Sequence, residues 1–187
     1  MQRFIPDIID KDRRLNILNH IKGLGYKNYY CAKPVKEFLY EFRKRASDIF
    51  DKDLVPTYGY TRHYQSGEYL HKHTDRASCQ HSFTICLDTN VEWPIHIDLK
   101  SGETVSHVTL AGEGVAYYGI TEPHWRDAIE VEGAYQWQMF LHYVDTRGPY
   151  AKKHAYDAHF LSVAKNLNSR EYKEKQEKYE NSLRIKK

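Results

Sequence analysis

The chain has 187 residues, of which 41% are hydrophobic and 28% charged, and its formal net charge is +3. This length and composition fit one soluble globular domain with a real core, and they exclude a disordered or fibrous chain. The last 23 residues carry eight basic and four acidic side chains, or +4, so about −1 remains for the rest, and no nucleic-acid partner is expected.

The three cysteines, Cys31, Cys79 and Cys86, are an odd number and lack the spacing of a zinc site or a disulfide framework. A reducing, cytoplasmic compartment fits them best. The N-terminus has no apolar signal region, and no stretch approaches 18 apolar residues. We therefore expect neither a signal peptide nor a membrane span.

Residues 1–55 are expected to form a helical support in two pieces. The first helix runs from Asp10 to about Lys22 and ends at the following glycines. The second runs from Val35 to about Phe50, has apolar residues at spacings of three and four, and is entered through Pro34.

Residues 56–146 change to short runs rich in Tyr, Thr, Val and Ile, broken by Gly, Pro and Asn. The predicted strands are Tyr58–Tyr64, Ser82–Leu87, Ile95–Leu99, Val105–Leu110, Gly114–Tyr118, His124–Val131 and Tyr135–Val144. This density of strands predicts a small barrel or sandwich. Residues 147–187 form a polar extension in which Asp157–Lys186 is expected to be helical.

A candidate metal site lies within the strand-rich part. His73 and Asp75 lie two residues apart in an extended segment, so their side chains project the same way, and His124 opens a later predicted strand. Two histidines and one carboxylate hold non-haem Fe(II) on one face and leave the other face open.

A second His-x-Asp, His96-Ile97-Asp98, shows that this pattern alone is common. There the alternation puts the polar pair on one face and aliphatic residues on the other, which a half-exposed strand explains without metal. The first pair differs by its surroundings, since Tyr64 and Gly67 precede it and a strand and turn lead to His124.

These surroundings resemble the Fe(II)- and 2-oxoglutarate-dependent dioxygenases of the prolyl 4-hydroxylase-like group. The matching residues are Tyr64, Gly67, His73, Asp75, the strand Thr84–Leu87, Gly114–Tyr118, His124 and Leu141–Asp145. The resemblance covers about Tyr58 to Asp145. It implies a mainly β, α+β fold, in which a double-stranded β-helix (jelly-roll, cupin-like) barrel is flanked by N-terminal helices and a C-terminal helix.

The resemblance also implies the cofactor Fe(II), bound by His73, Asp75 and His124, and the co-substrate 2-oxoglutarate, which Tyr64 would contact. The family's basic residue for the distal carboxylate of 2-oxoglutarate falls on Gln136, which is neutral and cannot pair as arginine does. Two arginines could replace it: Arg126, two residues after His124, is preferred, and Arg62, two residues before Tyr64, is the alternative.

Gln138 and His142 share a strand face with Gln136, so both are candidates to support the ligands or simply to be satisfied barrel polar groups. The resemblance implies a hydroxylase that uses O2 and a peptide or small-molecule substrate, coupling decarboxylation of 2-oxoglutarate to substrate oxidation. Two alternatives stay open: a metal-dependent cupin-like enzyme without 2-oxoglutarate, and a non-catalytic binding barrel.

Overall fold

A computed structural model describes residues 3–157. The helix predicted for Asp157–Lys186, and with it most of the 147–187 extension, lies outside the described residues. The helices are α1 (Lys11–Gly23), α2 (Lys33–Glu41), α3 (Arg43–Phe50) and α4 (Ala151–His154), with a 3-10 turn η1 at Ala77–Cys79. The strands are β1 (Phe4–Ile5), β2 (Asn28–Tyr30), β3 (Leu54–Gln65), β4 (Leu70–His73), β5 (His81–Thr89), β6 (Ile95–Asp98), β7 (Thr104–His107), β8 (Gly114–Tyr117), β9 (His124–Arg126) and β10 (Tyr135–Asp145).

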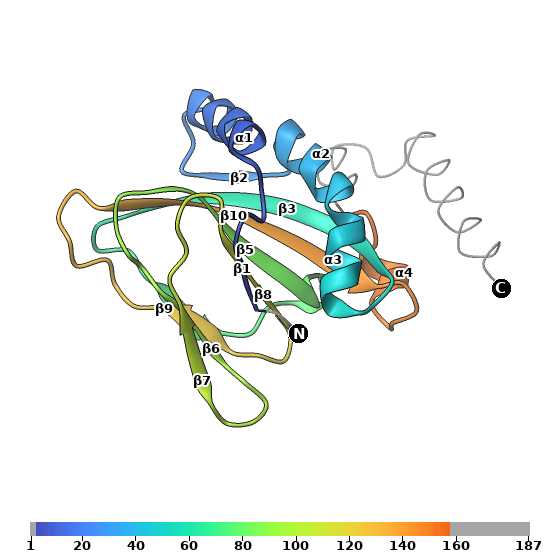
Figure 1. Ribbon diagram of the computed structural model, residues 1–187. Helices are drawn as coiled ribbons and strands as arrows, with labels where there is room; N and C mark the ends of the chain where they lie inside the picture. Colours follow the sequence, from blue (N-terminus) through green and yellow to red (C-terminus); the bar gives the residue numbers. More distant parts are fainter. Residues whose placement is uncertain (1–2, 158–187) are drawn as a thin grey trace.

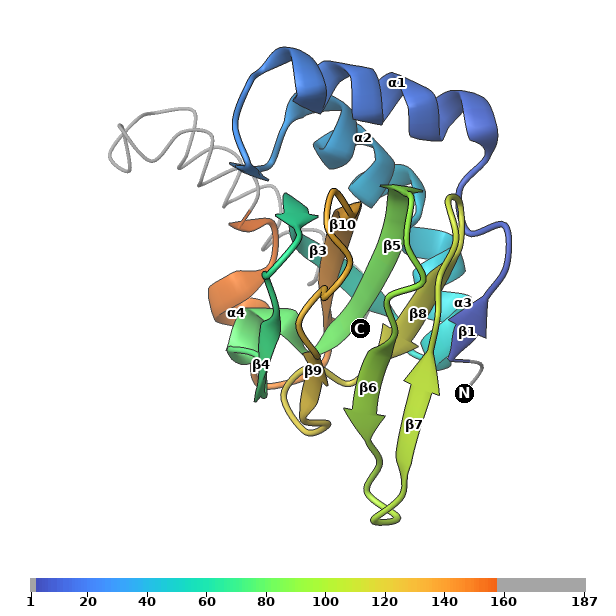
Figure 2. The same cartoon turned by 90° about the vertical axis from the view of Figure 1, so that its left-hand side faces the viewer.

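Two antiparallel sheets form the body of the molecule. The major sheet has the order β1-β8-β5-β10-β3-β2 and the minor sheet the order β4-β9-β6-β7. Along the chain, β3, β5, β8 and β10 belong to the major sheet and alternate with β4, the β6–β7 hairpin and β9 of the minor sheet. This winding between two sheets is the predicted double-stranded β-helix (Figures 1 and 2).

Helices α1, α2 and α3 cover the outer face of the major sheet (Figure 1). Side chains that alternate along the two central strands, β5 and β10, supply the apolar contact surface: Phe83, Ile85, Leu87, Trp137, Met139, Leu141 and Tyr143. Because successive side chains of a strand point to opposite faces, the residues between these seven face the other sheet. Many of them are polar and buried, including Thr84, Gln138 and His142.

The helix predicted for Val35–Phe50 is broken at Phe42, where α2 ends and α3 begins. The break lets rings from both helices contact one strand residue: Phe42 and Phe50 each meet Phe83 edge-on, with centroids 5.1 and 5.3 Å away. Packing on the sheet therefore overrides continuous helical periodicity here.

Strand β9 ends at Arg126, five residues before the predicted end. Beyond it the chain turns back on the β3–β4 connection, where Ile129 donates to the Glu68 carbonyl and accepts from the Gly67 amide. Strand β4 was expected only as an extended segment, because four residues carry too little alternation to mark a strand. Within residues 3–157, no helix is both long and apolar enough to cross a membrane.

Candidate metal centre

The structure brings His73, Asp75 and His124 together at the inner side of the minor sheet. His73 and His124 are opposite each other in the antiparallel pair of β4 and β9. Asp75 follows β4 and is fixed by its backbone amide, which donates to the Gly119 carbonyl at 2.8 Å. One donor atom from each of the three residues lies within 4.8 Å of the others.

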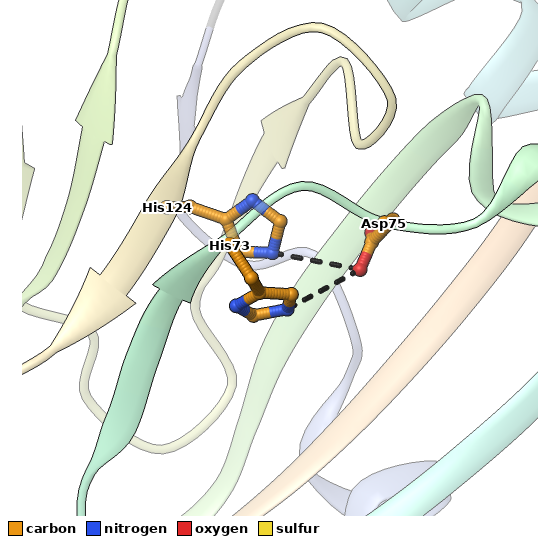
Figure 3. A group of neighbouring side chains, drawn as sticks. All are labelled: His73, Asp75 and His124. Atoms are coloured by element: carbon orange, nitrogen blue, oxygen red, sulfur yellow. Dashed lines mark ion pairs between the residues drawn. The ribbon is translucent and has the colours of Figure 1, made fainter.

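Backbone contacts determine which imidazole nitrogen each histidine offers. His73 Nδ1 lies 2.7 Å from the His71 carbonyl, and His124 Nδ1 lies 3.0 Å from the Glu122 carbonyl. A carbonyl only accepts, so both Nδ1 atoms carry a proton, and in the neutral imidazoles both Nε2 atoms keep a lone pair. The two Nε2 atoms lie 3.5 and 3.6 Å from the same oxygen, Asp75 Oδ1 (Figure 3).

The pKa values of the three groups follow from burial and mutual contact. Burial opposes ionisation of Asp75, but the contact with His73 and the nearby imidazoles outweigh it and hold the pKa of Asp75 below its ordinary value. The Asp75 carboxylate raises the pKa of His73, whereas burial lowers the pKa of His124. The carboxylate is therefore ionised at neutral pH, as a metal ligand must be.

A packed polar wall supports the other side of the Asp75 carboxylate. Ser82 Oγ donates to Asp75 Oδ2 at 3.3 Å and lies 2.9 Å from His142 Nδ1. Gly119 leaves room for the carboxylate, since a Cβ there would fall on it and on the Cys79 carbonyl. His142, 4% exposed, thus contacts Asp75 through Ser82.

Asp75, Cys79 and His142 form a second cluster of possible metal ligands, also within 4.8 Å of one another. Neighbouring side chains already occupy the possible ligand atoms of this cluster, because the Tyr58 hydroxyl lies 3.1 Å from Cys79 Sγ and Ser82 contacts His142. Both Cys79 and His142 are buried. We therefore interpret this cluster as the support of Asp75.

Arg126 lies between the two sheets and is 1% exposed. One of its guanidinium nitrogens, Nη1, donates to the Trp93 carbonyl, and the guanidinium stacks on the Trp93 ring with 4.7 Å to the centroid. Among the described residues, no carboxylate lies within ion-pair distance of it: Glu122 pairs with Arg3, and Asp127 lies beside His96. Burial lowers the pKa of Arg126 to about 10, so it remains a cation at neutral pH.

Neutral amides surround Arg126. The Gln138 amide is best satisfied with its oxygen accepting from Arg126 Nη2 at 3.2 Å and from Gln136 Nε2, and its nitrogen donating to the Ile85 carbonyl at 2.7 Å. Gln136 is opposite Tyr64 in the pair of β10 and β3, and all three of Gln136, Gln138 and Tyr64 are buried. These neutral side chains do not compensate the Arg126 charge.

Arg62 has a different environment. It is part-exposed, stacks on the Tyr64 ring at 4.3 Å and contacts Glu68 at 3.3 Å. It lines an open groove of about 460 Å³ together with Gly67, Glu68, Tyr69, Leu70, His71 and His73. Since His73 belongs to both the groove and the triad, the groove is an approach from solvent to the centre.

His96 and Asp98 do not form a site together. His96 contacts Ser106 Oγ at 2.7 Å, whereas Asp98 pairs with Lys72 at 2.5 Å. Both lie on the outer side of β6, as expected for a half-exposed strand.

Sequence reasoning missed four residues that hold this centre: Ser82, Gly119, Glu122 and Arg3. The backbone carbonyls that orient the histidines leave no signal in side-chain types. Gly119 lies within the turn before His124, and a glycine in that place is the one sequence signal of the close approach of Asp75. The contact between Arg3 and Glu122 joins residues 119 positions apart, which no local pattern shows.

No protein-family model and no curated protein matches the sequence. Solved structures match the fold. A prolyl-4-hydroxylase from Pseudomonas putida is 12% identical with a TM-score of 0.60, over 78% of this chain and 94% of that chain. HygX from Streptomyces hygroscopicus, with nickel and 2-oxoglutarate bound, is 12% identical with a TM-score of 0.61, over 78% and 83%.

SnoN, a non-haem alpha-ketoglutarate-dependent epimerase from nogalamycin biosynthesis, is 9% identical with a TM-score of 0.64, over 78% of both chains. The chain thus shares its fold with non-haem 2-oxoglutarate-dependent enzymes. Because these proteins include a hydroxylase and an epimerase, the fold does not select one reaction.

Proposed function

We propose that the protein is an Fe(II)- and 2-oxoglutarate-dependent oxygenase, with His73, Asp75 and His124 as its metal ligands. One observation carries this proposal: both Nδ1 atoms donate to backbone carbonyls, so both Nε2 lone pairs converge on Asp75 Oδ1. Two neutral imidazoles and one carboxylate suit Fe(II) and leave coordination positions open.

Arg126 would hold the distal carboxylate of 2-oxoglutarate. It projects on the same side of β9 as His124, and two residues of strand separate their Cα atoms by about 6.6 Å, near the length of an extended five-carbon diacid. A buried guanidinium that has no carboxylate partner within residues 3–157 offers donors for a bidentate contact. Tyr64, Gln136 and Gln138 would line this end of the cavity, and Arg62, already paired with Glu68, is the less suitable clamp.

Bound iron would supply oxygen activation, coupled to decarboxylation of 2-oxoglutarate to succinate and CO2. The chain's own residues bind and orient. The carbonyls of His71 and Glu122 keep the imidazoles in the ligating tautomer, and Ser82 and His142 hold the Asp75 carboxylate. The groove at His73 would admit a substrate, a peptide or small molecule, and we propose hydroxylation as the reaction, in line with the intact carboxylate ligand.

Anaerobic spectroscopy tests the proposal. Fe(II) together with 2-oxoglutarate should give a weak visible charge-transfer absorption that neither gives alone and that His73→Ala abolishes. Arg126→Ala should bind iron normally but require about a hundredfold more 2-oxoglutarate, since a charge-assisted bidentate contact is lost. Arg62→Ala is the matched control and should be close to the wild type.

Three other results of these experiments would each favour a different interpretation. Iron binding with no response to 2-oxoglutarate would favour a metal-dependent enzyme that does not use this co-substrate. No metal uptake would favour a binding barrel. Equal loss of 2-oxoglutarate affinity in Arg62→Ala, with none in Arg126→Ala, would transfer the clamp to Arg62.

A further inference from the structure

The turn Tyr118–Glu122 holds two of the three proposed metal ligands through its backbone. The Gly119 carbonyl accepts from the Asp75 amide at 2.8 Å, and the Glu122 carbonyl lies 3.0 Å from His124 Nδ1. Because both contacts are made by main-chain atoms, the position of this turn sets the orientation of both ligands.

The Glu122 side chain closes the turn. Its Oε2 accepts from the Tyr118 amide at 2.8 Å, and its own amide donates to the Tyr118 carbonyl at 2.9 Å. The Glu122 side chain is only 3% exposed. A carboxylate so buried requires a cationic partner, because removing it from water otherwise costs several kcal/mol.

Arg3 is that partner. Its Nη1 donates to Glu122 Oε2 at 2.9 Å and its Nη2 donates to Oε1 at 2.5 Å, a bidentate pair. Arg3 is itself anchored, since its carbonyl accepts from the Ala116 amide at 2.8 Å and the next residues form β1 on the edge of β8. The pairing of β1 with β8 thus holds the Arg3 guanidinium against the Glu122 side chain of the turn.

We infer that Arg3 is a positioning residue for the metal centre, acting through Glu122 and the Tyr118–Glu122 turn on His124 and Asp75. Arg3 touches neither the triad nor the groove. The effect of Arg3 on metal binding rests on the proposed function. The effect of Arg3 on the conformation of the turn does not depend on that function. An arginine directly before the first strand, 121 positions from His124, therefore determines how firmly the His124 imidazole is oriented.

Co(II) titration of the purified protein tests the effect on metal binding. Arg3→Ala should weaken Co(II) binding by about tenfold, the scale expected when a supporting contact of a metal ligand is lost, and change the visible Co(II) spectrum. Arg3→Lys keeps the positive charge but cannot make the bidentate contact. Its Co(II) affinity should therefore lie between that of the wild type and that of Arg3→Ala. Arg13→Ala is the control, because Arg13 lies on α1, away from the centre, and its Nη2 contacts both carboxylate oxygens of Glu41 at 2.7 Å on the surface.

A metal-free measurement keeps the two proposals apart. In the wild type, the imidazole nitrogen spectrum should show His124 with its proton fixed on Nδ1, and amide hydrogen exchange of the turn should be slow. Arg3→Ala and Glu122→Gln should each mix the two tautomers and speed exchange at residues 118–122, and the double variant should be no worse than either.

The inference is wrong if Arg3→Ala keeps the His124 tautomer and the slow exchange of the turn, or if Arg13→Ala weakens Co(II) equally. If instead the wild type takes up no metal but Arg3→Ala still releases the turn, the proposed function fails and the positioning of His124 by Arg3 stands.

Discussion

His81 shows how a single side chain can make stability depend on pH. It is 3% exposed, packs against the rings of Phe50 and Tyr118, and neither ring nitrogen has a hydrogen-bond partner among the described residues. Burial lowers its pKa to about 4; Lys52 acts in the same direction and Asp145 opposes it.

We expect the free energy of unfolding to fall as the pH is lowered from about 6.5 to about 4, because only the unfolded state then binds a proton at His81. A shift of this size corresponds to about 3 kcal/mol. Urea unfolding at several pH values measures it, and His81→Leu should flatten the acid limb. An unchanged pH dependence in that variant would contradict the assignment.

The tight space around Gly119 leads to a second prediction for a single residue. A Cβ at this position would meet the Cys79 carbonyl, the Asp75 carboxylate and Ser82 Oγ. Gly119→Ala should therefore displace Asp75, weaken metal binding and lower the free energy of unfolding by about 1–3 kcal/mol, as overpacking does. Isothermal titration with Co(II) and urea unfolding measure the two effects.

Gly23→Ala is the control for this substitution, since no atom of the described residues lies within 4 Å of a Cβ at this position, the end of α1. It should leave metal binding unchanged and stability equal or slightly higher. If Gly119→Ala behaved like Gly23→Ala, the tight fit around the Asp75 carboxylate would be disproved.

The sequence singled out three residues that the structure brings together, but not the contacts that support them. Residue types and strand alternation are local, so His73, Asp75 and His124 could be selected before the fold was known. The orientation of each imidazole depends on a carbonyl two residues away, and the Asp75 carboxylate depends on Ser82 and Gly119 from other segments. Such contacts exist only after the sheets have assembled.

At the scale of elements, prediction succeeded where a strand is long. The long strands β3, β5 and β10 were predicted over most of their lengths, because each has nine or more residues and is rich in strand-forming types. The two-residue and three-residue edge strands β1 and β2 were not predicted, since their pairing with β8 and β3 is a tertiary contact.

Helix α1 supplies a prediction at this scale. The Asp10 side chain caps the helix by accepting from the Arg13 amide at 2.8 Å. Asp10→Ala should lower the free energy of unfolding by about 1 kcal/mol, whereas Asp10→Asn keeps an acceptor and should change it little. Chemical denaturation distinguishes the two, and equal losses would mean that the carboxylate charge, not the cap, matters.

At the scale of the whole molecule, the proposed ligands come from two segments of the chain, β4 with the residues after it and β9, and they meet only when these strands pair in the minor sheet. Metal should therefore bind the folded state alone and stabilise it, by about 2.7 kcal/mol at a hundredfold excess over the dissociation constant. For a domain of this size, this corresponds to a rise in melting temperature of roughly 5–10 °C.

Calorimetry with and without Co(II) measures this rise. It should vanish in His73→Ala and persist in His20→Ala, which removes an exposed histidine of α1. A rise that survives His73→Ala would place the metal elsewhere on the molecule.

Alternate side chains of strand β10 face opposite sides of the major sheet. Gln136, Gln138, Phe140 and His142 face the space between the sheets, whereas Trp137, Met139, Leu141 and Tyr143 pack beneath the helices. Odd and even positions can therefore diverge independently, so that the reaction could be altered at even positions while the odd positions preserve the scaffold. For protein engineering, a library restricted to Gln136, Gln138 and Phe140 would vary the proposed co-substrate end of the cavity without disturbing the helix-facing core, whereas a one-residue deletion within β10 would exchange the two faces in the part of the strand whose register is shifted.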